Sequence, residues 1–174
     1  MASVNGVSIK SLKNFKGHEG EPCSQGNVYY QGKKLGFWSQ SAHGGEDMFE
    51  GFGETIEDIA KEVAKTLPET YKYKEYFAAD TLMNMVLDAM ELEKEYKKYI
   101  KMGAKTLLAA TDGYSRAQSG FRREFASEEE ALEAHTKDIE ELLKLVAKGA
   151  KVFAITSLGD LDIDTTKKFP CWLQ

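Results

Sequence analysis

Histidine and acidic side chains gather in two glycine-flanked segments of the first third of the chain. The first segment reads Lys-Gly-His-Glu-Gly-Glu-Pro-Cys and contains His18 and Glu19, and the second contains His43 and Asp47. If both segments lie at the same end of a sheet, these side chains supply an acid and a base for phosphodiester cleavage, or ligands for a divalent metal ion. The spacing matches no established metal motif such as His-Glu-x-x-His, and solvated polar loops are the simpler interpretation.

A second polar segment reads Thr-Asp-Gly-Tyr-Ser-Arg-Ala-Gln-Ser-Gly and spans 111–120. It follows a predicted buried strand, and loops at strand ends often bind ligands in α/β sheets. Asp112 and Arg116 are the side chains that would hold a polar group of a small molecule. The segment lacks the glycine-rich phosphate-binding motifs, so a solvated crossover loop is the favoured alternative.

Negative charge is concentrated between Glu128 and Glu141, where seven acidic residues accompany one lysine. Acidic residues favour the first turn of a helix because of the helix dipole, but four continue beyond it: Glu133, Asp138, Glu140 and Glu141. The row is either a solvated helix face or a mimic of nucleic-acid phosphates that occupies a basic groove on a partner. His135 falls on the apolar stripe of the same helix, so we assign it no function.

The segment 27–38 predicts a β-hairpin, with Gln31-Gly32 between two runs of β-prone residues. The expected register places Tyr30 opposite Lys33 and Val28 opposite Leu35. A further strand over 7–10 precedes the hairpin, and Leu12 and Phe15 break its alternation, which indicates a bulge near Ser11.

The same register places Tyr29 and Trp38 on one hairpin face beside Gly36. The two rings are either an exposed platform for a partner or a base, or part of the core beneath a helix. Core packing is the favoured interpretation.

Helices are predicted after residue 53, over 55–67, 80–102 and 127–146, from apolar residues at helical spacing and from N-terminal capping patterns. The second and third predicted helices are followed by similar sequences, in which a glycine precedes a short apolar strand and a polar turn. This similarity is either an internal repeat or the usual form of a helix-to-strand connection. Residues 121–125 suit a short edge strand.

These elements predict one α+β domain over 1–174, with a glycine-rich β part at 1–53 and a helix-rich part at 54–174. We expect an N-terminal antiparallel hairpin sheet, extended by the two later strands, with three to four helices packed on it.

Charge and composition exclude several classes of protein. The net charge of −5 argues against free binding of duplex DNA, because phosphate contacts require a basic face. No apolar run approaches the ~20 residues of a membrane span. Cys23 and Cys171 are too few for a disulfide scaffold, so we expect reduced thiols in a cytoplasm.

The N-terminal sequence resembles that of a known group of proteins in three stretches, at 9–13, 17–22 and 32–39 (Ile-Lys-Ser-Leu-Lys, Gly-His-Glu-Gly-Glu-Pro and Gly-Lys-Lys-Leu-Gly-Phe-Trp-Ser). These stretches are similar to small proteins carried by phages and plasmids of Gram-positive bacteria, some of which are type II anti-CRISPR proteins. The resemblance covers mainly the first 45 or so residues and transfers no catalytic residue. It implies a protein that disarms an RNA-guided effector nuclease in the cytoplasm of a bacterial host.

The expected function is therefore binding and inhibition of such a nuclease, either alone or together with its guide RNA, by a monomer or homodimer without a cofactor. The first alternative is an RNA-cleaving nuclease that uses His18 and Glu19 with His43 or Asp47, for which a divalent metal is conceivable. The second alternative is a small-molecule-binding protein that uses the Asp112–Arg116 segment.

Overall fold

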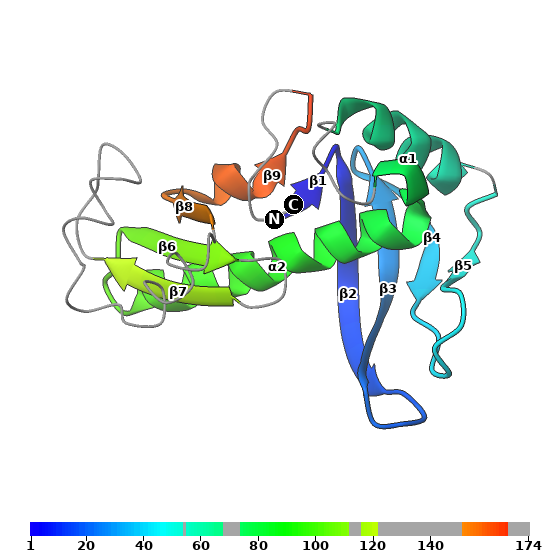
Figure 1. Ribbon diagram of the computed structural model, residues 1–174, viewed down its shortest axis with the longest axis horizontal. Coiled ribbons are helices and arrows are strands. Elements are labelled where there is room, and N and C mark those ends of the chain that lie inside the picture. Colours follow the sequence, from blue (N-terminus) through cyan, green and yellow to red (C-terminus); the bar gives the residue numbers. More distant parts are fainter. Residues whose placement is uncertain (54, 68–73, 112–115, 122–150, 167–174) are drawn as a thin grey trace.

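The protein is described by a computed structural model covering residues 1–53, 55–67, 74–111, 116–121 and 151–166, with backbone alone at 108–111, 116–121 and 151–154. Within these ranges it is an α+β fold with one six-stranded sheet, one three-stranded sheet and two α-helices (Figure 1). None of the helices in these ranges has the length and apolar character that a membrane crossing requires.

The six-stranded sheet is mixed and has the strand order β5-β4-β3-β2-β1-β9. Its strands are β1 (Ser3–Val4), β2 (Val7–Lys16), β3 (Pro22–Tyr30), β4 (Lys33–Ser39), β5 (Met48–Glu50) and β9 (Asp162–Ile163). Neighbouring strands are antiparallel except for β1 and β9, which are parallel. The β2–β3 hairpin is the longest pair, and its connecting loop lies far from the helices (Figure 1).

The hairpin turn has the predicted position, but the register beyond it differs. Gln31 and Gly32 have φ of 48° and 81°, and Tyr30 pairs with Lys33, which confirms the two-residue turn. Val28 pairs with Gly36, and the expected pairing with Leu35 is wrong because the register shifts between Val28 and Tyr29. Leu35 is the extra residue of a β-bulge and packs against the core.

The predicted bulge in β2 is confirmed. Ser11 has a φ of 55°, and the β2–β3 register shifts between Lys10 and Lys13. Leu12 lies within the bulge and packs against the core.

Two α-helices, α1 (Thr55–Thr66) and α2 (Ala79–Lys101), lie over one face of the six-stranded sheet (Figure 1). Both agree with the predicted helices to within a residue or two. Short 3-10 turns, η1 (Lys74–Tyr76) and η2 (Leu158–Leu161), adjoin α2 and β9. The described residues contain fewer α-helices than the three to four expected, and the predicted helix at 127–146 lies outside them.

The core lies between this sheet face and the two helices. It contains Val7, Ile9 and Val28 from the sheet, and the apolar stripes of α1 and α2. The helical residues are Ile56, Ile59, Ala60 and Val63 of α1, and Leu82, Met83, Met85, Val86, Ala89, Leu92 and Tyr96 of α2. Ile100, near the C-terminus of α2, is exposed.

The later strands form a sheet of their own, so the expectation that they extend the hairpin sheet is wrong. Strands β6 (Thr106–Thr111), β7 (Arg116–Phe121) and β8 (Lys151–Ile155) are antiparallel and have the order β7-β6-β8. The 23-residue α2 carries the chain about 34 Å along its axis, away from the first sheet, before β6 begins. The two strands of the suspected repeat, β6 and β8, then pair with each other.

Candidate functional site

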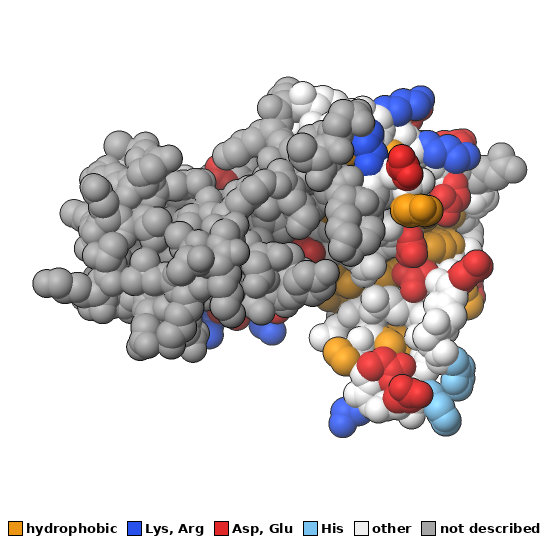
Figure 2. All heavy atoms as spheres, in the orientation of Figure 1, with side chains coloured by type: hydrophobic (Ala, Val, Ile, Leu, Met, Phe, Trp, Pro, Cys, Tyr) orange, Lys and Arg blue, Asp and Glu red, His pale blue; other side chains and the backbone are white. Residues whose placement is uncertain are grey.

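The structure brings His18 and His43 together at the end of the β2–β3 hairpin. Their ring centroids are 5.3 Å apart, with the ring planes tilted by 45°. His18 belongs to the β2–β3 loop and His43 to the β4–β5 loop, and both side chains are exposed. Figure 2 shows the two imidazoles side by side at the end of the molecule that projects away from the helices. The two loops therefore share one end of the sheet.

Backbone hydrogen bonds hold the two loops against each other. The His18 N–H donates to the Ala42 carbonyl at 2.7 Å, and the Gly17 N–H donates to the Glu21 carbonyl at 2.8 Å. In the second loop, the Ser41 hydroxyl accepts from the backbone N–H groups of His43 and Gly45, at 3.3 and 3.1 Å. The positions of both histidine backbones thus follow from local hydrogen bonding.

Asp47, one of the two carboxylates predicted to join the histidines, has another partner, and the Glu19 backbone contacts Glu21. Asp47 Oδ2 accepts a hydrogen bond from Trp38 Nε1 at 2.8 Å, and the backbone N–H of Glu19 donates to Glu21 Oε2 at 2.9 Å. Burial raises the pKa of Asp47 above its usual 3.8, the nearby charge of Asp80 acts in the same direction, and the hydrogen bonds from Trp38 and the Ser41 backbone oppose them. In the described ranges, no group of three or more His, Cys, Asp or Glu side chains is arranged to hold a metal ion. The constellation is therefore a histidine pair.

The sheet face opposite the helices carries aromatic and basic side chains, and we call it the outer face. Strand alternation and the observed registers place six aromatic or basic residues there: Lys10, Lys13, Phe15, Tyr29, Lys34 and Phe37. The three lysines are exposed, the three aromatic rings are half-buried, and the core cluster formed by the described residues does not include these rings. Lys10 Nζ lies 4.2 Å from the centroid of the Tyr29 ring. Glu50, the strand partner of Phe37, adds one negative charge.

Trp38 is not part of an exposed platform, so this part of the predicted binding surface is wrong. Its side chain is 0% exposed and lies on the helix side of the sheet. The core-packing interpretation holds for Trp38 because the bulge at Leu35 sets the register of β4. The same register places Phe37, which lies opposite Asn27, on the same outer face as Tyr29, an arrangement that the sequence reasoning missed. The doublet of aromatic residues at 37–38 signalled that one of the two rings must face outward.

The predicted Asp112–Arg116 loop is shorter than expected. Arg116 begins strand β7 and pairs with Thr111, so 116–120 are strand residues. The expected edge strand at 121–125 overlaps β7 only at Phe121, and 122–125 lie outside the described residues. Asp112 lies outside the described residues, as do Glu133, Asp138, Glu140 and Glu141.

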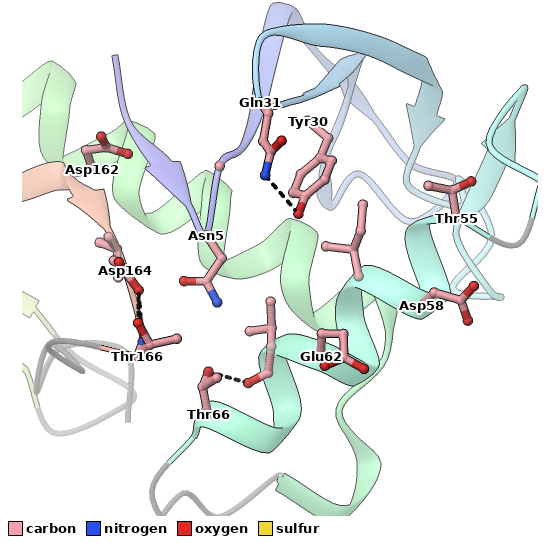
Figure 3. Close-up of a pocket in the computed structure, with 14 residues that line it drawn as sticks. Asn5, Tyr30, Gln31, Thr55, Asp58, Glu62, Thr66, Asp162, Asp164 and Thr166 are labelled. Carbon is pink, nitrogen blue, oxygen red and sulfur yellow. Dashed lines mark hydrogen bonds between the residues drawn. The ribbon is translucent and has the colours of Figure 1, made fainter.

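An open cleft of about 1010 Å³ lies between α1, the β3–β4 turn and the segment after β9 (Figure 3). Its lining includes four carboxylates: Asp58, Glu62, Asp162 and Asp164. Each has a partner, since Asp58 and Glu62 pair with Lys61 and Lys65, Asp162 accepts from the Ser3 hydroxyl, and Asp164 accepts from Thr166. These contacts explain the acidic residues without a ligand. For Asp162 and Asp164, the sequence signal was the alternation of aspartates at 160, 162 and 164.

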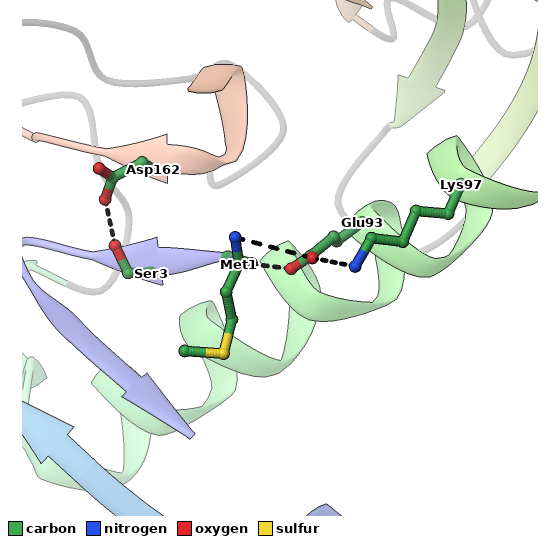
Figure 4. A network of polar contacts seen from close by, with 6 residues as sticks. Met1, Ser3, Glu93, Lys97 and Asp162 are labelled. Atoms are coloured by element: carbon green, nitrogen blue, oxygen red, sulfur yellow. Dashed lines mark hydrogen bonds and ion pairs between the residues drawn. The ribbon is translucent and has the colours of Figure 1, made fainter. Parts of the chain in front are cut away.

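A second groove lies along the C-terminal half of α2, and lysines and methionines line it. Figure 4 shows its best-connected residue, Glu93, which accepts from the Ala2 backbone N–H and pairs with Lys97 and, at 3.7 Å, with the Met1 ammonium. Burial raises the pKa of Glu93, but the contacts with Lys97, Ala2 and the ammonium together outweigh it and lower the pKa below 4.5.

Comparison of the chain with protein-family models, with curated proteins and with solved structures found no match in any of the three.

Proposed function

We propose that this protein binds and inhibits an RNA-guided effector nuclease in the cytoplasm of a bacterial host, and that its outer face contacts unpaired guide RNA. The observation that supports the proposal is the pattern of lysines and half-buried aromatic rings on the sheet face opposite the helices. The N-terminal resemblance to anti-CRISPR proteins suggests the type of partner.

Aromatic rings on an open antiparallel sheet suit unpaired bases. Each stacked base contributes about 1–3 kcal/mol, and stacking tolerates any base because every base has a π-face. Tyr29 and Phe37 lie on the same face of the neighbouring strands β3 and β4, where Phe37 pairs with Asn27, two residues before Tyr29, so each ring offers a stacking position.

The lysines of the outer face supply the positive charge that a nucleic-acid backbone needs. Lys10 and Lys13 flank the bulge of β2, and Lys34 lies opposite Tyr29 on β4. This positive charge is confined to the outer face, because the whole chain carries a net charge of −5. A small basic patch suits an RNA that is already held by a partner better than free duplex DNA.

The experiment measures binding of the full chain to a purified type II effector loaded with guide RNA. A Tyr29→Thr, Phe37→Thr double variant keeps β-propensity and the core, and we expect it to bind at least tenfold more weakly because two stacked bases are lost. The control is Tyr76→Thr, which removes a 78% exposed ring from η1 and leaves affinity unchanged. Equal affinity of the double variant and the control would show that the outer face is not the contact surface. The absence of any complex would refute the proposed inhibition by binding.

The histidine pair favours a second candidate function, cleavage of RNA. Two imidazoles 5.3 Å apart can act as base and acid, one removing the proton of a ribose 2′-hydroxyl and the other protonating the leaving 5′ oxygen. The same binding experiment separates the two functions, because guide RNA recovered from the complex stays intact under inhibition by binding and is shortened under cleavage. Loss of shortening in both His18→Gln and His43→Gln would assign cleavage to the pair.

A further inference from the structure

We infer that His18 and His43 form a chelating site for a transition-metal ion of the zinc, copper or nickel type. The observation is the placement of two exposed imidazoles from different loops at a centroid separation of 5.3 Å. The inference concerns the free protein and does not depend on the proposed inhibition or on RNA cleavage.

The separation matches the geometry of two imidazole ligands on one metal ion. Metal–nitrogen bonds of about 2.0–2.1 Å and a tetrahedral angle place the centroids of two ligating rings about 5 Å apart. Both side chains are exposed, so rotation about their side-chain torsions can aim one ring nitrogen of each at a shared position without moving the core.

The loops bring the two ligands together before any metal binds. The His18 N–H to Ala42 hydrogen bond joins the loops directly, and the Ser41 hydroxyl fixes the backbone at His43. Chelation therefore needs only side-chain ordering, whereas two histidines on independent loops would also lose loop entropy.

The ligand set selects the class of metal. Neutral imidazole suits zinc, copper and nickel, whereas calcium and magnesium require oxygen ligands. Asp47 is bonded to Trp38, and among the described residues no third His, Cys, Asp or Glu side chain is arranged to join the pair, so the two imidazoles are the protein ligands and water completes the coordination. A site of this kind exchanges its metal readily and offers open positions to a further ligand.

The test titrates Zn²⁺ into the untagged full chain by calorimetry, with imidazole ¹⁵N shifts recorded in parallel. We expect one equivalent of Zn²⁺ to bind, with shifts at His18 and His43, and neither Mg²⁺ nor Ca²⁺ to reproduce them. His18→Gln and His43→Gln should each weaken binding at least tenfold, because one imidazole alone cannot chelate.

The matched control is His135→Gln, which removes the remaining histidine of the chain and should leave Zn²⁺ affinity unchanged. Backbone amide spectra of the three variants verify that each is folded, as expected for His18 and His43 because neither side chain contributes to the core. The inference is wrong if Zn²⁺ does not bind, if either single variant at the pair keeps the parent affinity, or if His135→Gln abolishes binding.

Discussion

The Trp38 indole donates its Nε1 proton to Asp47 Oδ2 at 2.8 Å, which ties the buried face of β4 to the loop that carries His43. The indole is fully buried, and its polar edge is satisfied by a carboxylate that is itself partly buried. Because Asp47 binds Trp38, its carboxylate contacts the core and not the histidine pair. The contact also joins the core to the loop of the candidate site.

Replacing Asp47 by Asn should raise the melting temperature at pH 7. Burial raises the pKa of Asp47 above 3.8, so the folded protein retains a proton that the unfolded chain has released. Stability therefore falls as the pH rises from about 3.8 through the raised pKa. Asn keeps an oxygen that accepts from Trp38 and carries no charge, so its stabilising effect should be present at pH 7 and disappear near pH 3.5, where the parent is protonated.

Thermal unfolding of Asp47→Asn at both pH values checks this expectation. Glu46→Gln is the control, since it removes an exposed neighbouring charge. A lower melting temperature for Asp47→Asn at pH 7 would show that the charge on the carboxylate strengthens the Trp38 contact more than burial weakens it.

Replacing Gly32 by Val should destabilise the protein by about 1–2 kcal/mol, because the left-handed conformation is unfavourable for a β-branched residue. The φ of Gly32 is 81°, and no side chain lies where a Cβ would be placed, so the effect comes from the backbone. Urea unfolding measures it. Gly45→Ala, at an exposed glycine without a positive φ, should change the midpoint little, and equal midpoints for the parent and Gly32→Val would contradict the expected backbone strain at Gly32.

Replacing Glu93 by Gln should destabilise the protein, because the buried carboxylate accepts from the Ala2 backbone and pairs with Lys97. The loss should be about 1–3 kcal/mol, as for a buried hydrogen-bonded charge whose partners are left unpaired. Its pKa is lowered, so the stability it contributes is present above about pH 4.5 and is lost as the pH falls through the folded pKa.

The matched control is Glu62→Gln, which breaks an exposed pair with Lys65 and should have an effect within about 0.5 kcal/mol. Chemical unfolding at pH 7 and pH 3.5 distinguishes the two variants. If Glu93→Gln and Glu62→Gln are equally mild at pH 7, the contacts of Glu93 contribute no net stability.

Replacing Lys10, Lys13 and Lys34 together by Gln should weaken binding to the loaded effector and make it less sensitive to salt. Loss of three phosphate contacts to single-stranded RNA reduces the slope of log K against log salt by about 2. The control replaces Lys61, Lys65 and Lys98 by Gln. It gives the same net charge, and these lysines lie on the helices, away from the outer face. If the two triple variants show the same affinity and salt slope, phosphate contacts at the outer face are excluded.

Local sequence signals determined the hairpin turn, the bulge at Ser11 and the extent of both helices. Each signal acts over a few residues: glycine permits a positive φ, a break in alternation marks a bulge, and helical spacing marks a buried stripe. The sequence analysis required both histidine loops to lie at the same end of the sheet. They do, because successive connections of an antiparallel sheet alternate between its two ends, and these loops are the first and third connections of β2 to β5.

Tertiary structure decided which side chains face outward and which strands share a sheet. One additional residue, Leu35, placed Trp38 on the face opposite Tyr29, where the expected register had both on one face, because side chains alternate with a period of two and a single insertion reverses every later one. Whether β6 and β8 joined the first sheet depended on the distance that α2 spans and on their ability to pair with each other. The partner of Asp47 was likewise undetermined by spacing, since Trp38 and Asp47 meet only after β4 and the following loop have folded against the core.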